Sequence, residues 1–497
     1  MGKSSRVVIG LDFGTTFSGP GTTLKVPSVI SYDKDISKWG YQVGPLCEVI
    51  RGSKLLLDES QDQEYAPSLA SKSLMAQYNK NAVQVSGEYL RHLVLHVNET
   101  LQRRFGDAAK SLEIKFVLTV PALWSDKAKD ATLQAAIMAG INSNQISLVS
   151  EPEAAALHSL RTIQPNSITK DDVLVVCDAG GGTVDLISYK VKEVDPLSLE
   201  EATQGTGEII DDRVPQLNHL FLISKGAVCG SLLLDERFER LLMKKVGLQN
   251  YQSLPIKSKE AALSFWRDMV KPTFGEESDC DFLDVDHFVP LPGAADQPDK
   301  NIDSGFVQFE GFEIEEIFEP IVSRVEELVR GQLEKIARDR LNAKAIVLVG
   351  GFGSSRYLLQ RLKGSNPSIL VLQPPNAWAS VVSGAVLRGL EGNRVETRIS
   401  RRWYGVSANT PFDKARHAKR QKHWSDIEEH WVVQDNMTWY IKKSAKISER
   451  QPIKFNFYRA VRVDQANNLH FTDDLFFCND DREPDFRCDS EYLESDF

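Results

Sequence analysis

Three segments of the chain are short, almost wholly apolar runs that each end in a glycine-rich turn. They are Val7–Gly19, Val173–Ile187 and Ala345–Tyr357. A run that is apolar at nearly every position is typical of a strand buried on both faces, as in the centre of an α/β sheet. The first two segments also share the order apolar run, Asp, Gly, Thr. This weak internal repeat predicts a duplicated lobe.

Between the first two segments the pattern predicts alternating strands and helices. Pro121 ends one apolar run, since proline has no N–H for a strand ladder, and Ser125 has the character of a helix N-cap. We expect elements at Phe116–Val120, Asp126–Ala139 and Ile146–Val149, followed by an alanine-rich helix from Glu151.

The second half of the chain is patterned less clearly. Leu232–Val246 and Glu313–Arg340 have helical spacing, and residues 276–304 are acidic and rich in Pro, Gly and Asp, which predicts a loop or insertion. After Gly392 apolar and polar residues alternate with a period of two, which predicts strands at Trp439–Ile441 and Ile453–Phe457. The acidic stretch Asn479–Phe497 is expected to fray.

Composition narrows the class of protein. The 497 residues are 42% hydrophobic and 26% charged, as in a globular protein of several domains, and the formal net charge is −10. An acidic chain repels phosphate backbones, so no nucleic-acid partner is expected. The run Lys414–Lys422 is basic and leaves open a nuclear signal, although a solvated loop is the simpler interpretation.

Targeting features predict a cytoplasmic protein with no membrane association. The first residues run directly into a strand pattern, which leaves no room for a signal peptide, and no apolar run approaches the ~20 residues of a membrane span. Six cysteines without a C-x-x-C pair indicate a reducing compartment and no structural metal site.

The glycine-rich turns have the composition of phosphate cradles. Glycine lets backbone N–H groups approach an anion, and the hydroxyls of Thr15 and Thr16 add donors. An aspartate at a strand end, such as Asp12, suits a water-mediated contact to Mg²⁺. The second turn, from Asp178 to Asp185, repeats this logic with three consecutive glycines.

The third turn, Gly350–Arg356, has the order strand, tight turn, helix start, which admits an anion or a ribose closely. Taken alone, each turn could equally be an ordinary hairpin or a bulge. No P-loop signature is present in the sequence. The conjunction of the three turns, in order and each after a buried strand, carries the prediction of a nucleotide site.

Together these segments resemble the two phosphate motifs and the adenosine motif of the superfamily that contains sugar kinases, heat-shock proteins and actin. Within it, Leu118–Ala128 and Ile146–Ala156 are similar to the inter-lobe segment of the 70-kDa heat-shock proteins, and Glu151-Pro-Glu-Ala-Ala is close to a hallmark of that family. The resemblance covers residues 5–392 and is to a divergent, fungal-type branch. It implies an α/β, two-lobed actin-like ATPase fold, with duplicated ribonuclease H-like lobes and a small C-terminal β-rich region.

The resemblance assigns roles residue by residue. It implies that Asp12 and Asp178 orient a hydrated Mg²⁺, and that Glu151 and Asp185 position the attacking water. It implies ATP or ADP as the nucleotide, with phosphates held by Gly14, Thr15, Thr16, Gly180, Gly181, Gly182 and Thr183, and with adenosine lined by Gly350, Gly351, Gly353, Arg356 and, through a looser match, Lys271. A catalytic lysine is expected before the inter-lobe segment. Lys54 is the best candidate, with an ordinary surface lysine as the alternative.

The chain departs from the family at three places. Only Gly19–Val26 separates Ser18 from Pro27-Ser-Val, and at about 3.3 Å per residue this cannot supply the family's two further strands and their turn. Either the lobe tolerates a shorter sheet or the chain is a truncated product. Trp378 stands where the family has an acidic residue, and the residues after 392 are too few for the family's peptide-binding sandwich with its helical lid.

We therefore expect a first lobe over 1–190, a second over 191–344, the adenosine motif and return helix over 345–392, and a rudimentary β-rich region over 393–497. The leading hypothesis is a heat-shock-like ATP-binding protein, a slow Mg²⁺-dependent ATPase that couples lobe closure to client proteins and co-chaperones. The alternatives are a nucleotide-binding scaffold without turnover and a small-molecule kinase of the same superfamily.

Overall fold

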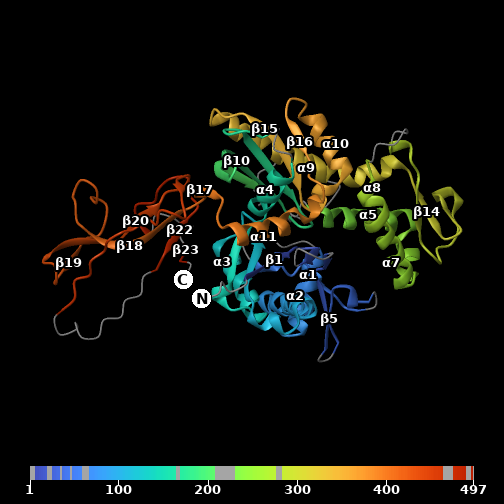
Figure 1. Cartoon of the computed structure of the whole chain (residues 1–497), viewed down its shortest axis with the longest axis horizontal. Helices are drawn as coiled ribbons and strands as arrows, with labels where there is room; N and C mark the ends of the chain where they lie inside the picture. The colour runs from blue at the N-terminus through green and yellow to red at the C-terminus, as the bar shows by residue number, and fades with distance from the viewer. Residues whose placement is uncertain are drawn as a thin grey trace. The chain divides into compact units, whose positions relative to one another are not determined.

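The computed structural model describes residues 6–19, 25–33, 36–44, 47–58, 66–163, 168–207, 230–275, 282–462, 474–487 and 494–495. The chain divides into two compact units, residues 1–197 with 205–394, and residues 198–204 with 395–497 (Figure 1). The four-part division expected from the sequence is finer than this and stays a prediction.

The first unit contains a sheet with the strand order β3-β2-β1-β7-β8. Its strands are β1 (Arg6–Phe13), β2 (Phe17–Gly19), β3 (Val26–Pro27), β7 (Glu113–Val120) and β8 (Ile146–Ser150). β1 runs parallel to β7 and β7 parallel to β8, whereas β2 returns antiparallel to β1. One antiparallel hairpin strand therefore flanks a parallel core.

A second sheet of the same unit repeats this arrangement. Its strands include β9 (Val173–Ala179), β10 (Val184–Val194), β15 (Ala343–Val349) and β16 (Leu370–Leu372), in the order β16-β15-β9-β10. β10 is antiparallel to β9, while β9, β15 and β16 are parallel. The correspondence of β2-β1-β7-β8 with β10-β9-β15-β16 confirms the duplicated α/β fold predicted from the sequence. All seven residues of β9 are buried, as its continuous apolar run predicts.

Two pairs of helices cover the first sheet. One pair, α2 (Ala82–Phe105) and α3 (Asp126–Met138), shares a core with β1 that includes Leu11, Phe13, Tyr89 and Trp124. α3 starts as predicted, because the Ser125 hydroxyl accepts a hydrogen bond from the N–H of Ala128 at 3.1 Å.

The other pair is α4 (Glu151–Thr162) and α11 (Ser380–Glu391), of which α11 packs on β1 and β7 and α4 packs on β9 (Figure 1). The two helices cross in backbone contact. A Cβ on Gly384 would lie 1.6 Å from the carbonyl oxygen of Ala154, so only glycine fits at this position. Ala154, Ala155 and Ala156 are fully buried at the crossing.

The first unit has further elements around these two sheets. A small sheet is formed by β4 (Val29–Asp33), β5 (Ile36–Trp39) and β6 (Ile50–Arg51), next to α1 (Ala66–Gln77). The remaining helices are α5 (Ser231–Val246), α6 (Leu248–Ser253), α7 (Ile256–Phe265), α8 (Lys271–Thr273), α9 (Gly311–Arg338) and α10 (Arg356–Ser365). α5 and α9 confirm the two helices predicted in this region, within a few residues at each end.

Of the loop or insertion predicted over residues 276–304, a structureless loop is wrong for the described part, and the insertion stays a prediction; residues 276–281 lie outside the described residues. β12 (His287–Pro290), β13 (Ile302–Asp303) and β14 (Phe306–Phe309) form an antiparallel sheet of their own. Val289, Ile302 and Val307 are fully buried. Three short strands with one or two inward side chains each can make a core although the composition around them is that of a loop.

The second unit is rich in strands. β11 (Leu197–Gly207) pairs with β17 (Val395–Ile399), which pairs in turn with β21 (Lys446–Ile447). A separate sheet contains β18 (Trp403–Pro411), β19 (His423–Ser425), β20 (His430–Ile441), β22 (Phe476–Cys478) and β23 (Glu494–Ser495). β20 confirms the strand predicted around Trp439. In the basic run, Arg420 and Lys422 lie over the rings of Phe486 and Trp431, at 4.1 and 4.3 Å.

Two predictions for the second unit need correction. Ile453–Phe457 is not a strand, because no described strand pairs with its backbone; instead the ring of Phe455 lies 4.6 Å from that of Tyr440. The acidic tail does not simply fray in its described part, since β23 pairs with β22 and Asn436 pairs with Phe486. Among the described residues, no helix is both long and apolar enough to cross a bilayer.

Candidate functional site

The first glycine turn joins β1 to β2, and Asp12 stands at its entrance. The strand register pairs Asp12 with Gly19 and Phe13 with Ser18. A Cβ on Gly14 would lie 2.2 Å from the carbonyl oxygen of Phe17, so the turn requires glycine there. The hydroxyl of Ser28 donates to the carbonyl of Gly14 at 2.6 Å and fastens the turn from the side.

The hairpin that follows is short but intact in its pairing. β2 has three residues and β3 has two, with Phe17 opposite Pro27 and Ser18 opposite Val26. Residues 20–24, which lie between these strands, are outside the described residues. Both alternatives left open by the sequence, a lobe that tolerates a shorter sheet and a truncated product, stay predictions.

The carboxylate of Asp12 is buried and already has two partners. Its Oδ2 accepts from Nζ of Lys25 at 2.6 Å, and its Oδ1 accepts from the hydroxyl of Thr119 at 3.3 Å. The sequence analysis did not single out Lys25. It had interpreted the segment that carries Lys25 only as the place where strands are missing.

The second turn joins β9 to β10 through the three consecutive glycines. Asp178 and Asp185 lie opposite each other in the register of the two strands. The N–H of Gly180 donates to the carbonyl of Thr183 at 2.9 Å, which closes the turn. Asp178 and Asp185 are both buried, with exposed fractions of 6% and 4%.

The two turns lie against each other. A Cβ on Gly181 would be 2.2 Å from the hydroxyl oxygen of Thr16, and a Cβ on Gly182 would be 2.8 Å from that of Thr15. Only glycine, which has no side chain, permits this close approach. The threonine hydroxyls of the first turn therefore lie beside the glycine backbone of the second. Donors from both halves of the duplicated fold can therefore face one anion.

The N-terminus of α5 also reaches the second turn, which the sequence analysis missed. The N–H groups of Ser231 and Leu232 donate to the carbonyls of Gly180 and Gly181, at 3.3 and 3.0 Å. A Cβ on Gly230 would lie 2.2 Å from the carbonyl oxygen of Gly181. The available signal was the Gly-Ser pair directly before an amphipathic helix, which is typical of a helix start.

Lys54 and Glu151 form a buried ion pair. Nζ of Lys54 donates to Oε1 of Glu151, and the exposed fractions of the two side chains are 3% and 11%. Nζ also lies 5.5 Å from the centre of the Trp124 ring. Lys54 is therefore not an ordinary surface lysine. Glu151 is the first residue of α4, so the pair joins the inter-lobe helix to the segment before α1.

The carboxylates of the site influence one another. Burial raises the pKa of the Glu151 carboxyl above its usual range, and the charge of Lys54 opposes this rise. Burial raises the pKa of Asp178 well above its usual range, and the negative charges of Glu151, Asp185 and Asp12 raise it further. Strongly perturbed carboxyl groups that gather beside glycine turns are a physical signature of a functional site.

The third glycine turn adjoins the second. Gly350 has a φ of +92°, and a Cβ there would lie 2.4 Å from both the carbonyl oxygen of Ala179 and Oδ1 of Asp178. Gly351 is exposed, with open space where a Cβ would be, and Gly353 packs on Leu348. Arg356 is exposed at the start of α10. The structure thus brings Gly350 to the start of the second glycine turn and leaves open space at Gly351.

Lys271 lies on the helical segment that packs beside this turn. Its Nζ donates to Oδ1 of Asp235 on α5 at 2.6 Å. Four residues later, Gly275 contacts the backbone of Tyr357, and the ring of Phe274 lies 5.2 Å from that of Tyr357. Lys271 is therefore held between α5 and the neighbourhood of α10, and its predicted contact with adenine stays a prediction.

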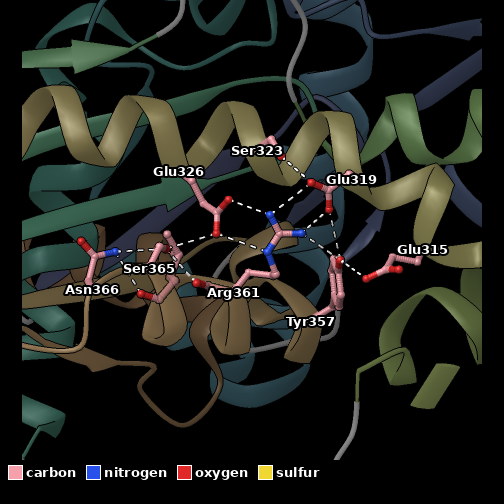
Figure 2. A network of polar contacts seen from close by, with 9 residues as sticks. Glu315, Glu319, Ser323, Glu326, Tyr357, Arg361, Ser365 and Asn366 are labelled. Carbon is pink, nitrogen blue, oxygen red and sulfur yellow. Dashed lines mark hydrogen bonds and ion pairs between the residues drawn. The ribbon is translucent and has the colours of Figure 1, made fainter. Parts of the chain in front are cut away.

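A polar network fixes α10, which begins at the third turn, to α9 (Figure 2). The guanidinium of Arg361 donates to the carboxylates of Glu319 and Glu326, to the latter at 2.8 Å, and the Tyr357 hydroxyl donates to Glu315 at 3.0 Å. Hydrogen bonding from Arg361 holds the pKa of Glu319 below its usual range. The charged ends of α9 side chains thereby set the position of the helix start that follows Gly353.

Within the described part of the chain, no group of three or more His, Cys, Asp or Glu side chains is arranged to hold a metal directly. At Asp12, the ammonium of Lys25 takes the place beside Oδ2 that a cation or its water would need. The residues present do not fit Mg²⁺ at Asp12 while this ion pair exists, and the predicted role of Asp178 toward Mg²⁺ stays a prediction.

Two copies of one sheet pattern, joined by a helix pair and meeting at facing glycine turns, define the class: a two-lobed, actin-like ATPase fold. The comparisons with known proteins agree with this class. A family model described as "Hsp70 protein" matches residues 58–195. The human heat shock 70 kDa protein 12A is 22% identical in an alignment of 414 positions that covers 68% of this chain and 57% of that protein.

Two further relatives match. The human heat shock 70 kDa protein 12B is 24% identical in an alignment of 529 positions that covers 83% of this chain and 73% of the relative. A chaperone protein HscA homolog from Vibrio cholerae serotype O1 is 31% identical in an alignment of 214 positions that covers 36% of this chain and 32% of the relative. The chain spans 57% of the length of the 12A protein that it matches. The matches support a divergent relationship of this chain to the Hsp70 family.

Proposed function

We propose that this chain binds ATP or ADP between its two glycine turns and hydrolyses ATP slowly. The observation that carries the proposal is the convergence of Asp12, Glu151, Asp178 and Asp185 with the buried Lys54, at the place where the turns contact each other. Hydroxyls and N–H groups of the turns would hold the phosphates. The third turn, next to Asp178, would take the adenosine at Gly351, Gly353 and Arg356.

Hydrolysis in this arrangement depends on positioning and on charge stabilisation, which are the main protein contributions to phosphoryl transfer. Glu151 is oriented by Lys54 and would hold the attacking water in its hydrogen-bond network. Asp185 would assist from the opposite strand. Mg²⁺, when bound, supplies charge neutralisation at the phosphates, and we assign no step to it because Lys25 stands at Asp12.

Coupling to a partner is the further part of the proposal. The relatives include proteins named as heat-shock proteins and as a chaperone, which favours client proteins and co-chaperones as partners in the cytoplasm. A nucleotide that contacts both turns binds one relative arrangement of the two halves better than others, and so shifts their equilibrium. The helix pair α4 and α11 would be the joint for this movement.

The test uses one substitution inside the proposed site and one matched control outside it. Gly351→Val fills space that is open in the structure, so the protein should fold normally. Gly364→Val also meets no atoms within 4 Å, but it lies at the far end of α10. In calorimetric titrations with ATP, we expect micromolar binding by the parent and by Gly364→Val, and at least ~10-fold weaker binding by Gly351→Val.

Unfolding temperatures of both variants serve as the folding control. Equal binding by the parent and both variants would contradict an adenosine site at the third turn. No binding by a folded parent would overturn the nucleotide proposal altogether. Binding without phosphate release over hours would leave the scaffold alternative as the better account of the same site.

A further inference from the structure

Lys25 reaches the first turn from two strands away. The register aligns Asp12 with Gly19 on β2, and Lys25 directly precedes β3, the neighbour of β2. Strands are about 4.8 Å apart, so Lys25 starts about 10 Å from β1. The long side chain can span this distance because Gly19, in the strand between, has no side chain. A Cβ on Gly19 would lie 3.4 Å from Cα and Cγ of Lys25.

The ammonium is held by more than one contact. Nζ of Lys25 donates to Oδ2 of Asp12 at 2.6 Å and lies 5.8 Å from the centre of the Trp378 ring. The exposed fractions of the Lys25 and Asp12 side chains are 16% and 6%. Trp378 belongs to the loop that follows β16, next to the third turn. A lysine from the shortened hairpin is therefore packed between the carboxylate of the first turn and an aromatic ring on the other half of the fold.

The positive charge of Lys25 acts on other carboxylates of the site. Its charge acts on Glu151 and on Asp178, where it lowers the pKa of each and opposes the effects of burial. The site thus has four buried carboxylates and two lysines that belong to the chain itself, Lys25 at Asp12 and Lys54 at Glu151. The lysine at the first turn is the one that stands where a metal-bound water would otherwise contact Asp12.

We infer that Lys25 is a built-in cation that makes nucleotide binding by this chain largely independent of Mg²⁺. This inference rests on the proposed nucleotide site. An ammonium on a flexible stem binds phosphate as a point charge, and it can keep its contact with Asp12 through one N–H while it directs others toward the β- and γ-phosphates. Because β3 has only two residues, Lys25 directly before it lies at the carboxylate of Asp12.

The experiment compares the parent with Lys25→Met and with a matched control. Lys245 is also partly buried, also donates to a carboxylate at 2.6 Å, and also lies over an aromatic ring at 4.7 Å, but it is located at the far end of α5. ATP is titrated calorimetrically into each protein in excess EDTA and again in excess MgCl₂. Unfolding temperatures with and without ATP give a second readout.

The parent and Lys245→Met should bind ATP in EDTA within ~3-fold of their affinity in MgCl₂. Lys25→Met should lose at least ~10-fold in EDTA and regain part of that loss in MgCl₂, since the carboxylate is then free to hold a hydrated cation. Lys25→Arg, which keeps the charge, should stay close to the parent.

The outcomes separate this inference from the proposed function. No ATP binding by the folded parent in either buffer would overturn the nucleotide site itself. Binding by the parent in MgCl₂ alone would leave the nucleotide site standing and overturn the role of Lys25. Unchanged binding by Lys25→Met in EDTA would do the same. The parent titration in EDTA needs no variant, so the inference stays testable if Lys25→Met does not fold.

Discussion

The two glycine turns occupy equivalent places in a duplicated fold, but they differ in length and in charge. The second hairpin pairs seven residues of β9 and β10, from Val173 opposite Lys190 to Ala179 opposite Val184. The first pairs only Asp12 and Phe13 of β1 with β2. Charge differs as well: Lys25 lies at the aspartate of the first turn, whereas burial and negative neighbours dominate at Asp178.

This difference shows that a short hairpin can preserve a turn if other contacts replace the lost ladder. The first turn is fastened by Ser28 on Gly14 and by the packing of Phe13 against Tyr89, whose rings are 5.9 Å apart. The second turn relies on its long strands and on the start of α5. Strand length and side-chain contacts are alternative ways to fix the same backbone geometry.

The largest expected effect comes from the most deeply buried charges. Lys54→Met leaves Glu151 buried without its cation, so we expect a loss of about 3 kcal/mol in the free energy of unfolding, measured in urea. Lys245→Met, which breaks a more exposed pair, should cost about 1 kcal/mol or less. Adding Glu151→Gln to Lys54→Met should recover most of the loss. Equal costs for the two lysines would show that burial does not matter here.

A substitution in the second turn can break the contact between the two turns. Gly181→Ala places a methyl group 2.2 Å from the hydroxyl oxygen of Thr16, and the overpacking should cost about 2 kcal/mol. Gly351→Ala, in open space, should be nearly neutral in the same urea experiment. Thr16→Ala should restore part of the stability of Gly181→Ala. A neutral Gly181→Ala would mean that the turns do not touch in solution.

The charge asymmetry predicts opposite responses to amide substitution. The pKa of Asp178 is raised in the folded state, so the folded protein keeps a proton that the unfolded chain releases as the pH rises. The free energy of unfolding therefore falls between the pKa of the unfolded carboxyl and the raised pKa of the folded one. Asp178→Asn removes this fall. The nucleotide-free variant should melt a few degrees above the parent at pH 7.5, and the gain should vanish toward pH 4, near the ordinary carboxyl pKa of about 3.9.

Asp12→Asn is the matched change at the first turn. It removes the partner of Lys25 and leaves the ammonium partly buried, so the variant should melt below the parent at pH 7.5. Thermal unfolding of both variants between pH 4 and 8 is the measurement. The same sign for the two amide variants would contradict the difference in charge between the two turns.

The smallest expected effect concerns single hydroxyls. Ser28→Ala removes the hydrogen bond to Gly14 and the 2.7 Å contact with Ser18, and should cost about 1 kcal/mol in the free energy of unfolding. Thr183→Val in the second turn removes only a long contact, 3.5 Å to Asp185, and should cost about half of that or less. A larger loss for Thr183→Val would show that the second turn also needs side-chain support.

The sequence predicted the fold well where the physical signal is local. β1, β9 and β15 are continuous apolar runs, and Pro121 and Ser125 mark a strand end and a helix start through their own backbone chemistry. The strand predicted at Ile453–Phe457 failed because alternation shows that a segment could pair, but not whether a partner strand is available.

The site was predicted only in part, because its charges come from separate segments. The turns around Asp12 and Asp178 are visible as motifs. The burial of Lys54 and its pair with Glu151, 97 residues further along the chain, follow from tertiary packing and are not encoded near Lys54. Lys25 was missed because its role depends on the register of two very short strands and on the absent side chain of Gly19.

The crossing of α4 and α11 also has a mechanical side. At Gly384 the two helices touch through backbone atoms, with small alanines around them. Further along the same two helices, the ion pairs Arg161–Glu391 and Arg388–Glu153 also join them. Close backbone contact at one point leaves no room for either helix to approach the other more closely. In the proposed movement of the two halves, a methyl group added at Gly384 would therefore force the helices apart and displace the axis about which they turn.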